Sequence, residues 1–243
     1  MKLNILKLSV LFALFNTSAC NQESPPPVPK TATIYATADA SIFNSTATPG
    51  QYNDYGNGGS DMLRVGNVKN NYVDRTLLSF DVSSIEGFTV DSAKLSLTIA
   101  KGGTSILPIS VYKLTESWTE GTTDEGCLVT DACTIPGILI TGADVSWSHA
   151  TFNTAAWSTS GGTFASTASA TSSKDFSLYE GQGITDDVKA WVANSASNFG
   201  WILKIDEASV LNTGGEHLWY YSREASLNGA AETTQPTLTV YYH

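Results

Sequence analysis

Basic residues are scarce in this sequence. The 243 residues include 13 lysines and arginines against 23 aspartates and glutamates, and the formal net charge is −10 at pH 7. A protein of that charge repels phosphate, so we expect no binding to nucleic acid and no broad contact with anionic membranes. A local cluster of basic side chains would still be able to bind an acidic ligand.

A bias toward helix-forming residues is also missing, whereas threonine, serine, valine and aromatic residues are frequent. Short segments alternate apolar and polar side chains, as half-buried strands do, at residues 76–82, 93–99 and 237–242. Residues 120–174 show only weak strand signals and are predicted to form an insertion. The sequence therefore predicts an all-β fold, an antiparallel β-sandwich or jelly roll with one short α-helix, as a single domain over residues 31–243.

No apolar run reaches the roughly 20 residues that a membrane-spanning helix needs. The run Leu8–Phe15 follows two lysines and precedes small residues and Cys20, which is typical of an export signal over residues 1–19. Cleavage before Cys20 would leave a lipid-modified N-terminus on a proline-rich tether, residues 20–30. Thr17 and Ala19 also suit ordinary signal peptidase. We expect an exported protein, either a cell-surface or outer-membrane lipoprotein held to the membrane through its lipid anchor only, or a secreted one.

Cysteine is rare as well, with three in the chain. If Cys20 carries lipid, Cys127 and Cys133 remain, and they bracket a short loop that predicts a disulfide in an oxidising compartment. Zinc is the alternative, but it needs further ligands, and the histidines stand isolated at His149, His217 and His243.

Catalytic motifs are missing too: the sequence contains no nucleophile elbow, P-loop, dinucleotide fingerprint or His-Glu-x-x-His helix. The strand motifs of jelly-roll polysaccharide lyases are also absent. Two carboxylates suffice for a glycosidase, so the acidic residues leave hydrolysis formally open. We predict a protein that is not an enzyme and has no certain cofactor. If an ion is bound, we favour structural Ca²⁺, with Asp39 and Asp61 as candidate ligands.

Residues 186–206 carry two tryptophans, Trp191 and Trp201. Val188, Trp191 and Val192 share one face of a helix that we expect Asp186 to cap and Asn194 to end. Trp201, Leu203 and Ile205 share one face of the strand that follows. Since aromatic stripes of this kind are far more often core than ligand platform, we predict that both tryptophans are buried.

Several segments, in order, resemble the DNRLRE-domain family, a secreted jelly roll that includes carbohydrate-binding module family 96. They are ATADASI, LRVG, DRTLLSFDVSSI, VDSAKLSL, ISVYKLTESWTEGTT, residues 186–206, YSREA and PTLTVYY. VSWSHATFNTAAWSTSGGTF is similar to a further family segment, with Ser148 where asparagine is usual. The resemblance implies a sandwich that binds polysaccharide, for some members an acidic one such as alginate, and it implies no reaction.

Side chains suited to an acidic glycan are few. The basic candidates are Arg64, Arg75, Lys113 and Arg223, because guanidinium and ammonium groups bind uronate carboxylates. The aromatic candidates are Tyr52, Tyr55, Tyr72, Trp157 and Tyr220, with Tyr72 and Tyr220 favoured, because sugar rings stack on aromatic faces. Internal ion pairs explain the arginines about as well, since Arg75 and Arg223 have acidic neighbours in the sequence. A monomeric polysaccharide-binding domain is favoured over a structural or adhesive envelope protein.

Overall fold

The computed structural model describes residues 26–45, 48–68, 72–102, 107–126, 137–172, 175–209 and 216–243. Cys20, Cys127 and Cys133 lie outside these ranges, so the lipid site and the disulfide stay predictions. Within the described part of the chain, no helix is long and apolar enough to cross a membrane.

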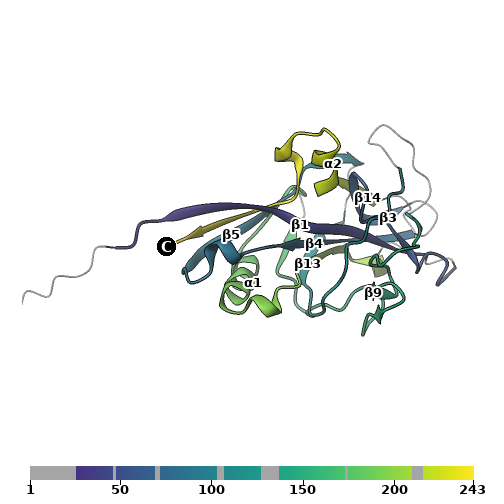
Figure 1. Ribbon diagram of the computed structural model, residues 1–243, viewed down its shortest axis with the longest axis horizontal. Helices are drawn as coiled ribbons and strands as arrows, with labels where there is room; N and C mark the ends of the chain where they lie inside the picture. The colour runs from purple at the N-terminus through teal and green to yellow at the C-terminus, as the bar shows by residue number, and fades with distance from the viewer. Residues whose placement is uncertain are drawn as a thin grey trace, which may run out of the picture.

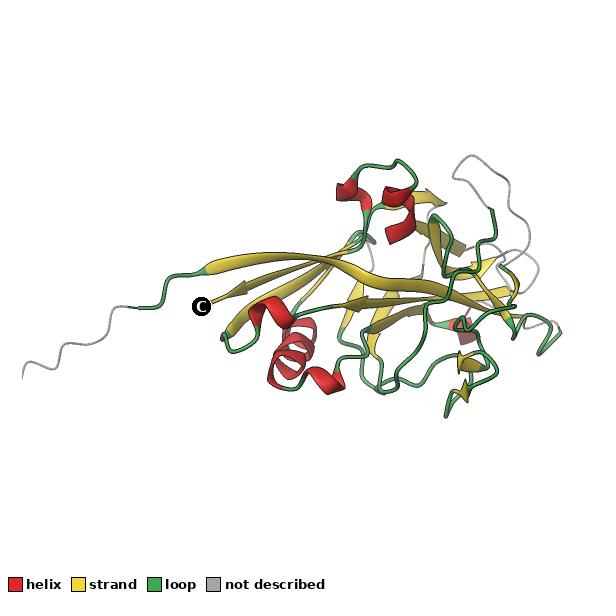
Figure 2. Cartoon of the chain, in the orientation of Figure 1, coloured by secondary structure: helices red, strands yellow, loops and turns green. Residues whose placement is uncertain are grey.

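Strands dominate the structure (Figures 1 and 2). They are β1 (Lys30–Ser45), β2 (Tyr55–Gly56), β3 (Met62–Val68), β4 (Tyr72–Phe80), β5 (Val90–Ser96), β6 (Ile99–Gly102), β7 (Ile109–Lys113), β8 (Ile138–Leu139), β9 (His149–Thr151), β10 (Ala155–Ala156), β11 (Ala170–Ser172), β12 (Leu178–Glu180), β13 (Trp201–Ile205), β14 (Glu216–Tyr221) and β15 (Thr237–Tyr242). The helices are α1 (Gln182–Ala193) and the five-residue α2 (Arg223–Leu227), with 3₁₀ turns η1 (Ser83–Ile85), η2 (Ser195–Ser197), η3 (Glu207–Ser209) and η4 (Glu232–Thr234). The predicted all-β fold is confirmed.

The long strand β1 belongs to two sheets. Its first residues, Lys30–Tyr35, pair with β15, and Ala36–Ser45 pair with β4 after an irregularity between Ala36 and Ala38. The strand order is β11-β7-β13-β4-β1-β15-β5-β12. In addition, β3 pairs with β4, β14 pairs with β3, and β6 pairs with β14. Every strand pair is antiparallel. In Figure 1, β1 runs along most of the molecule's length.

The main core lies between the sheets and α1. Trp191 of α1 and Trp201 of β13 are both fully buried there, with ring centroids 4.4 Å apart. The prediction that they are core is confirmed. The helix starts earlier than expected, at Gln182 after Gly181, so Asp186 lies inside it and does not cap it, whereas Asn194 does end it.

A second core covers the opposite face of β4 and β13. Ile202 and Leu77 point into it, where they meet Val145, Trp147 and Trp157. These partners come from the predicted insertion, which forms only short strands such as β9 and β10. The central strands are thus covered on both faces, as their nearly continuous burial requires.

The strand predictions hold in part. Segment 237–242 forms β15, and segment 76–82 lies in β4 as far as Phe80, where the strand ends although Val82 is still buried. The row expected over 93–99 ends with β5 at Ser96. Ile99 begins a different strand, β6, and is 40% exposed. The chain turns after Leu97, so the alternation of Ala93, Leu95 and Leu97 does not continue to Ile99.

Candidate functional site

The predicted ligand residue Arg64 lies inside the protein, with 2% of its surface exposed. Its Nη2 is 2.7 Å from Glu125 Oε2, and its guanidinium carbon is 4.1 Å from the centre of a Trp219 ring. Both contacts are internal and the side chain has almost no surface left for a ligand, so Arg64 is not a ligand residue.

Arg75 is also internal, at 8% exposed. Its Nε and Nη2 each donate to a Glu207 oxygen at 2.7 Å, and its guanidinium lies 4.3 Å from the Trp147 ring. Its Nη1 also donates to the carbonyl of Gly161. The internal ion pair therefore explains Arg75, although its partner is Glu207 and neither Asp74 nor Asp81.

The other two basic candidates also contact acidic residues of the protein. Lys113 Nζ is 3.1 Å from Asp187 Oδ1, and its side chain is 33% exposed. Arg223 Nη2 is 2.8 Å from Glu120 Oε2 and 2.6 Å from Glu224 Oε1. The four basic residues thus have different acidic partners and do not form one exposed patch.

The aromatic candidates divide into buried and half-buried groups. Tyr220 is fully buried and donates to the carbonyl of Phe176 at 2.8 Å, and Trp157 donates to the carbonyl of Ser146 at 2.9 Å. Neither ring is available to a sugar. Tyr72 is half-buried, as are Tyr52 and Tyr55, and all three form an edge-to-face group.

The structure instead exposes one face of the sheet made by β1, β15, β5 and β12. Alternate side chains of these strands point into the core, and the remaining ones point out. We name the outward set the outer sheet face: Thr31, Thr33, Tyr35, Ser92, Lys94, Ser96, Leu178, Glu180, Thr237, Thr239 and Tyr241. Most of its side chains carry hydroxyl groups.

The strand register brings these side chains into rows across the sheet. Thr33 pairs with Thr239, which pairs with Lys94, which pairs with Glu180. In the next row Ser92 pairs with Tyr241, a residue that is 38% exposed and whose ring centroid lies 5.8 Å from Lys94 Nζ. The alternation over 93–99 and 237–242 predicts these strands from their apolar side chains, but the polar side chains between them were not identified as a binding surface.

A shallow hollow of about 380 Å³ opens at the edge of the outer sheet face. It is lined by Asp91, Lys94, Glu180, Gln182 and Tyr241, among others. An aromatic ring beside amide, ammonium and carboxylate groups suits a sugar, because the ring stacks on an apolar CH face while the polar groups bond to hydroxyls.

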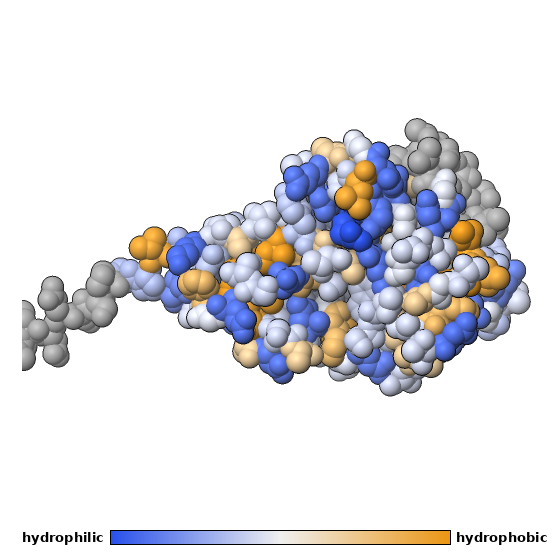
Figure 3. All heavy atoms as spheres, in the orientation of Figure 1, coloured by the Kyte–Doolittle hydropathy of each residue, from blue (hydrophilic) through white to orange (hydrophobic). Residues whose placement is uncertain are grey.

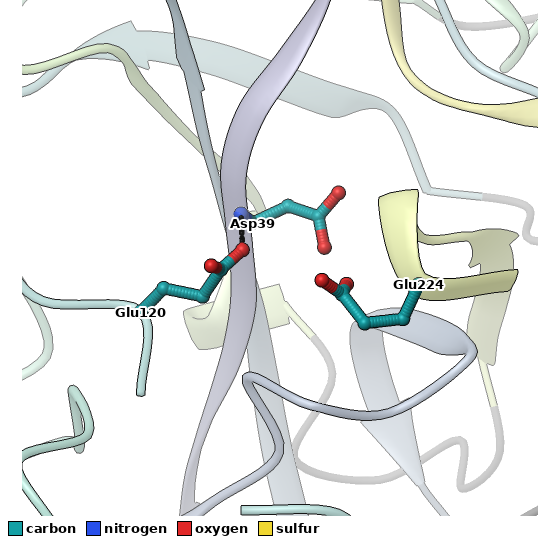
Figure 4. Close-up of side chains that lie close together, drawn as sticks. All are labelled: Asp39, Glu120 and Glu224. Atoms are coloured by element: carbon teal, nitrogen blue, oxygen red, sulfur yellow. Dashed lines mark hydrogen bonds between the residues drawn. The ribbon is translucent and has the colours of Figure 1, made fainter. Parts of the chain in front are cut away.

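A group of three carboxylates forms a second feature (Figure 4). Asp39 comes from β1, Glu120 from the segment after β7, and Glu224 from α2, and one oxygen of each lies within 4.8 Å of the others. Burial raises the pKa of Asp39 well above its usual value, and the nearby Glu224 raises it further. Asp39 is 1% exposed, so a glycan does not reach its carboxylate, whereas Glu120 is half-buried.

The other predicted metal ligand, Asp61, is not in this group. It accepts a hydrogen bond from Asn228 Nδ2 at 2.6 Å. Glu120 and Glu224 were missed as ligands, although both lie in segments that carry the family resemblance, WTEGTT and SREA. Their distance from Asp39 in the sequence concealed them.

Comparison with known proteins supports the resemblance. A search of curated proteins found no match. Residues 30–124 match the family model of carbohydrate-binding module family 96. This segment holds β1 to β7, Lys94 and two of the three grouped carboxylates. The predicted resemblance is therefore confirmed over residues 30–124, where the chain is similar to the carbohydrate-binding modules of family 96.

Proposed function

We propose that this protein is an exported, surface-anchored, non-catalytic domain that binds polysaccharide on its outer sheet face. The match of residues 30–124 to a carbohydrate-binding module family carries the proposal. The choice of surface rests on the two exposed rows of hydroxyl side chains, with Tyr241 and Lys94 beside the hollow.

Binding of this kind needs no chemistry. A flat face contacts several sugar units at once, each contact is modest, and the sum gives affinity. Tyr241 supplies an exposed ring for stacking, and threonine and serine hydroxyls exchange hydrogen bonds with the sugar.

An acidic glycan such as alginate is the favoured ligand. Lys94 is the basic residue of the outer sheet face among the described residues, with Nζ 5.8 Å from the Tyr241 ring centroid. It replaces Arg64 and Arg75, which are committed to internal ion pairs. A charge-assisted contact predicts that salt weakens binding.

The rival is a structural or adhesive envelope protein. Protein-packing surfaces are commonly contiguous apolar patches. On the side shown in Figure 3, the apolar residues among those described are scattered in small groups between polar ones. This side therefore lacks the large apolar patch that a packed protein partner commonly covers.

The test is calorimetric titration of the mature protein with alginate oligomers and with a neutral glucan. We expect binding to alginate that Tyr241→Ala and Lys94→Ala each weaken about tenfold, the loss of one stacking or charge-assisted contact. Phe152→Ala, in the β9–β10 turn, is the matched control and should bind normally. Binding to neither glycan would favour the structural rival, and binding unaffected by both variants would place the ligand on another surface.

Anchoring is tested separately. A Cys20→Ala variant should still be exported but leave the membrane fraction, because the lipid chains attached there supply the attachment. If the variant stays with the membrane, the anchor is elsewhere.

A further inference from the structure

The three grouped carboxylates lie where three separate parts of the chain meet. Asp39 is in the middle of β1, Glu120 follows β7, and Glu224 is in the first turn of α2. Figure 4 shows the Asp39 and Glu224 side chains pointing toward each other from β1 and α2. Like charges brought together in this way repel unless something positive lies between them.

Two oxygens in this group lack a hydrogen-bond donor. Asp39 is 1% exposed, and its Oδ2 accepts from the Arg223 backbone N–H at 2.8 Å, while its Oδ1 has no partner. Glu224 is 9% exposed, and its buried Oε2 likewise has none. A buried carboxylate oxygen without a partner costs free energy, and a bound cation removes that cost.

The local charge is also unbalanced. Arg223 is the cation of this group, and its guanidinium bridges Glu120 and Glu224. With all three carboxylates ionised, one guanidinium leaves two negative charges, which a single divalent cation would neutralise.

We propose that Asp39, Glu120 and Glu224 bind a calcium ion. Two oxygens on opposite sides of Ca²⁺, each about 2.4 Å from it, are about 4.8 Å apart, so oxygens within 4.8 Å of one another can share one ion. All the ligand atoms are carboxylate oxygens, which select a hard cation and disfavour zinc. Calcium tolerates irregular geometry and bidentate carboxylates, whereas magnesium requires a near-ideal octahedron and keeps several waters.

The ion would fasten α2 and the 117–126 segment to β1. Glu120 already accepts from the Asp39 backbone N–H at 2.6 Å, and Ser222, which caps α2, donates to the Ser60 carbonyl at 2.6 Å. Calcium would add a direct link among the three carboxylates. The alternative is that Asp39 and Glu224 share a proton, in which case the group needs no metal.

The proposal is tested by titrating the full mature protein with Ca²⁺ after a chelator has removed any bound metal. We expect one bound Ca²⁺ per chain by calorimetry, with a dissociation constant of about 10⁻⁴ M or tighter, and a thermal midpoint that rises with Ca²⁺. The proposal is wrong if about 10 mM Ca²⁺ produces no binding signal and no shift of the thermal midpoint.

Variants locate the ion. Asp39→Asn and Glu224→Gln should each weaken Ca²⁺ binding at least tenfold, and Glu86→Gln, an exposed control on η1's C-terminal side, should not. Wild-type affinity in folded Glu224→Gln would mean that the ion binds elsewhere and the proposal is wrong. If Asp39→Asn does not fold, Glu120→Gln and the wild-type midpoint shift still decide the outcome. Glycan binding is measured separately, so failure of either proposal leaves the other standing.

Discussion

The indole Nε1 of Trp201 donates a hydrogen bond to Asp187 Oδ2 at 2.8 Å, which links β13 to α1 through the main core. Asp187 also lies 3.1 Å from Lys113 on β7 and accepts from Ser169. The carboxylate thus has partners on three other segments, and its burial is compensated. Trp191 packs against the Trp201 ring, with the two ring planes inclined by 55°.

Trp191→Ala should lower the free energy of unfolding by about 3 to 5 kcal/mol, because it deletes a fully buried aromatic side chain and leaves a cavity. Denaturant titration measures the loss. Glycan affinity per folded molecule should be unchanged, since Trp191 is remote from solvent. A stable variant with lost affinity would make Trp191 a ligand contact after all.

Arg75→Ala should destabilise the protein by about 1.5 to 3 kcal/mol, the range for hydrogen bonds to charged groups. The variant loses both Glu207 contacts and the stacking on Trp147. The double variant Arg75→Ala, Glu207→Gln should cost less than the two single variants added together, because they share one interaction. If Arg75→Ala keeps full stability but loses alginate affinity, the arginine acts in binding.

Asp74→Asn should remove part of the pH dependence of stability. Burial raises the pKa of Asp74 to about 7, and Arg64 opposes the shift while Glu125 adds to it. The raised pKa means that the stability Asp74 contributes is present below about pH 4 and is lost as pH rises through 7. Wild type should therefore lose up to about 1.4 kcal/mol per pH unit more than Asp74→Asn between pH 4 and 7.

Unfolding at a series of pH values measures this difference. Exposed Glu232 provides the control, because Glu232→Gln should leave the pH profile as it is in wild type. Parallel profiles for wild type and Asp74→Asn would show that Asp74 titrates normally.

Gly58→Ala should destabilise the protein by about 1 to 3 kcal/mol, the usual cost of overpacking. A Cβ at Gly58 would collide with the backbone carbonyl of Glu120. The displacement should also weaken Ca²⁺ binding. Gly87→Ala is the control: nothing lies within 4 Å of its Cβ, so only the strain of φ +80° remains and Ca²⁺ affinity should be kept. Equal Ca²⁺ affinity in both variants would argue against coupling between Gly58 and the carboxylates.

Much of the fold could be predicted because it is written in local patterns. The alternation over 237–242 and the helix face of Val188 and Trp191 depend on neighbours in the sequence, and both appear in the structure. The strands β9 and β10 could not be predicted, because they have only three and two residues and depend on packing partners that are distant in the sequence.

The candidate site could be predicted less well. The sequence predicts Arg64 and Tyr220 as ligand residues, but both are buried against partners that are far away in the sequence, Glu125 and Phe176. Asp39 was identified as a metal candidate, whereas Glu120 and Glu224 join it only through the folded chain. Which residues form such a site depends on contacts between segments that are far apart in the sequence, and a single sequence does not reveal those contacts.

The sharing of β1 between two sheets has a mechanical consequence. A pull on the N-terminus enters at Lys30, beside the outer sheet face, and the strand continues to Ser45 with one irregularity in its pairing between Ala36 and Ala38. Its ladders to β15 and then to β4 lie along the direction of that pull, so tension loads many backbone hydrogen bonds in shear together rather than peeling them one by one. If the protein is held by this end and binds a polymer, drag on the polymer would load both ladders of β1 together.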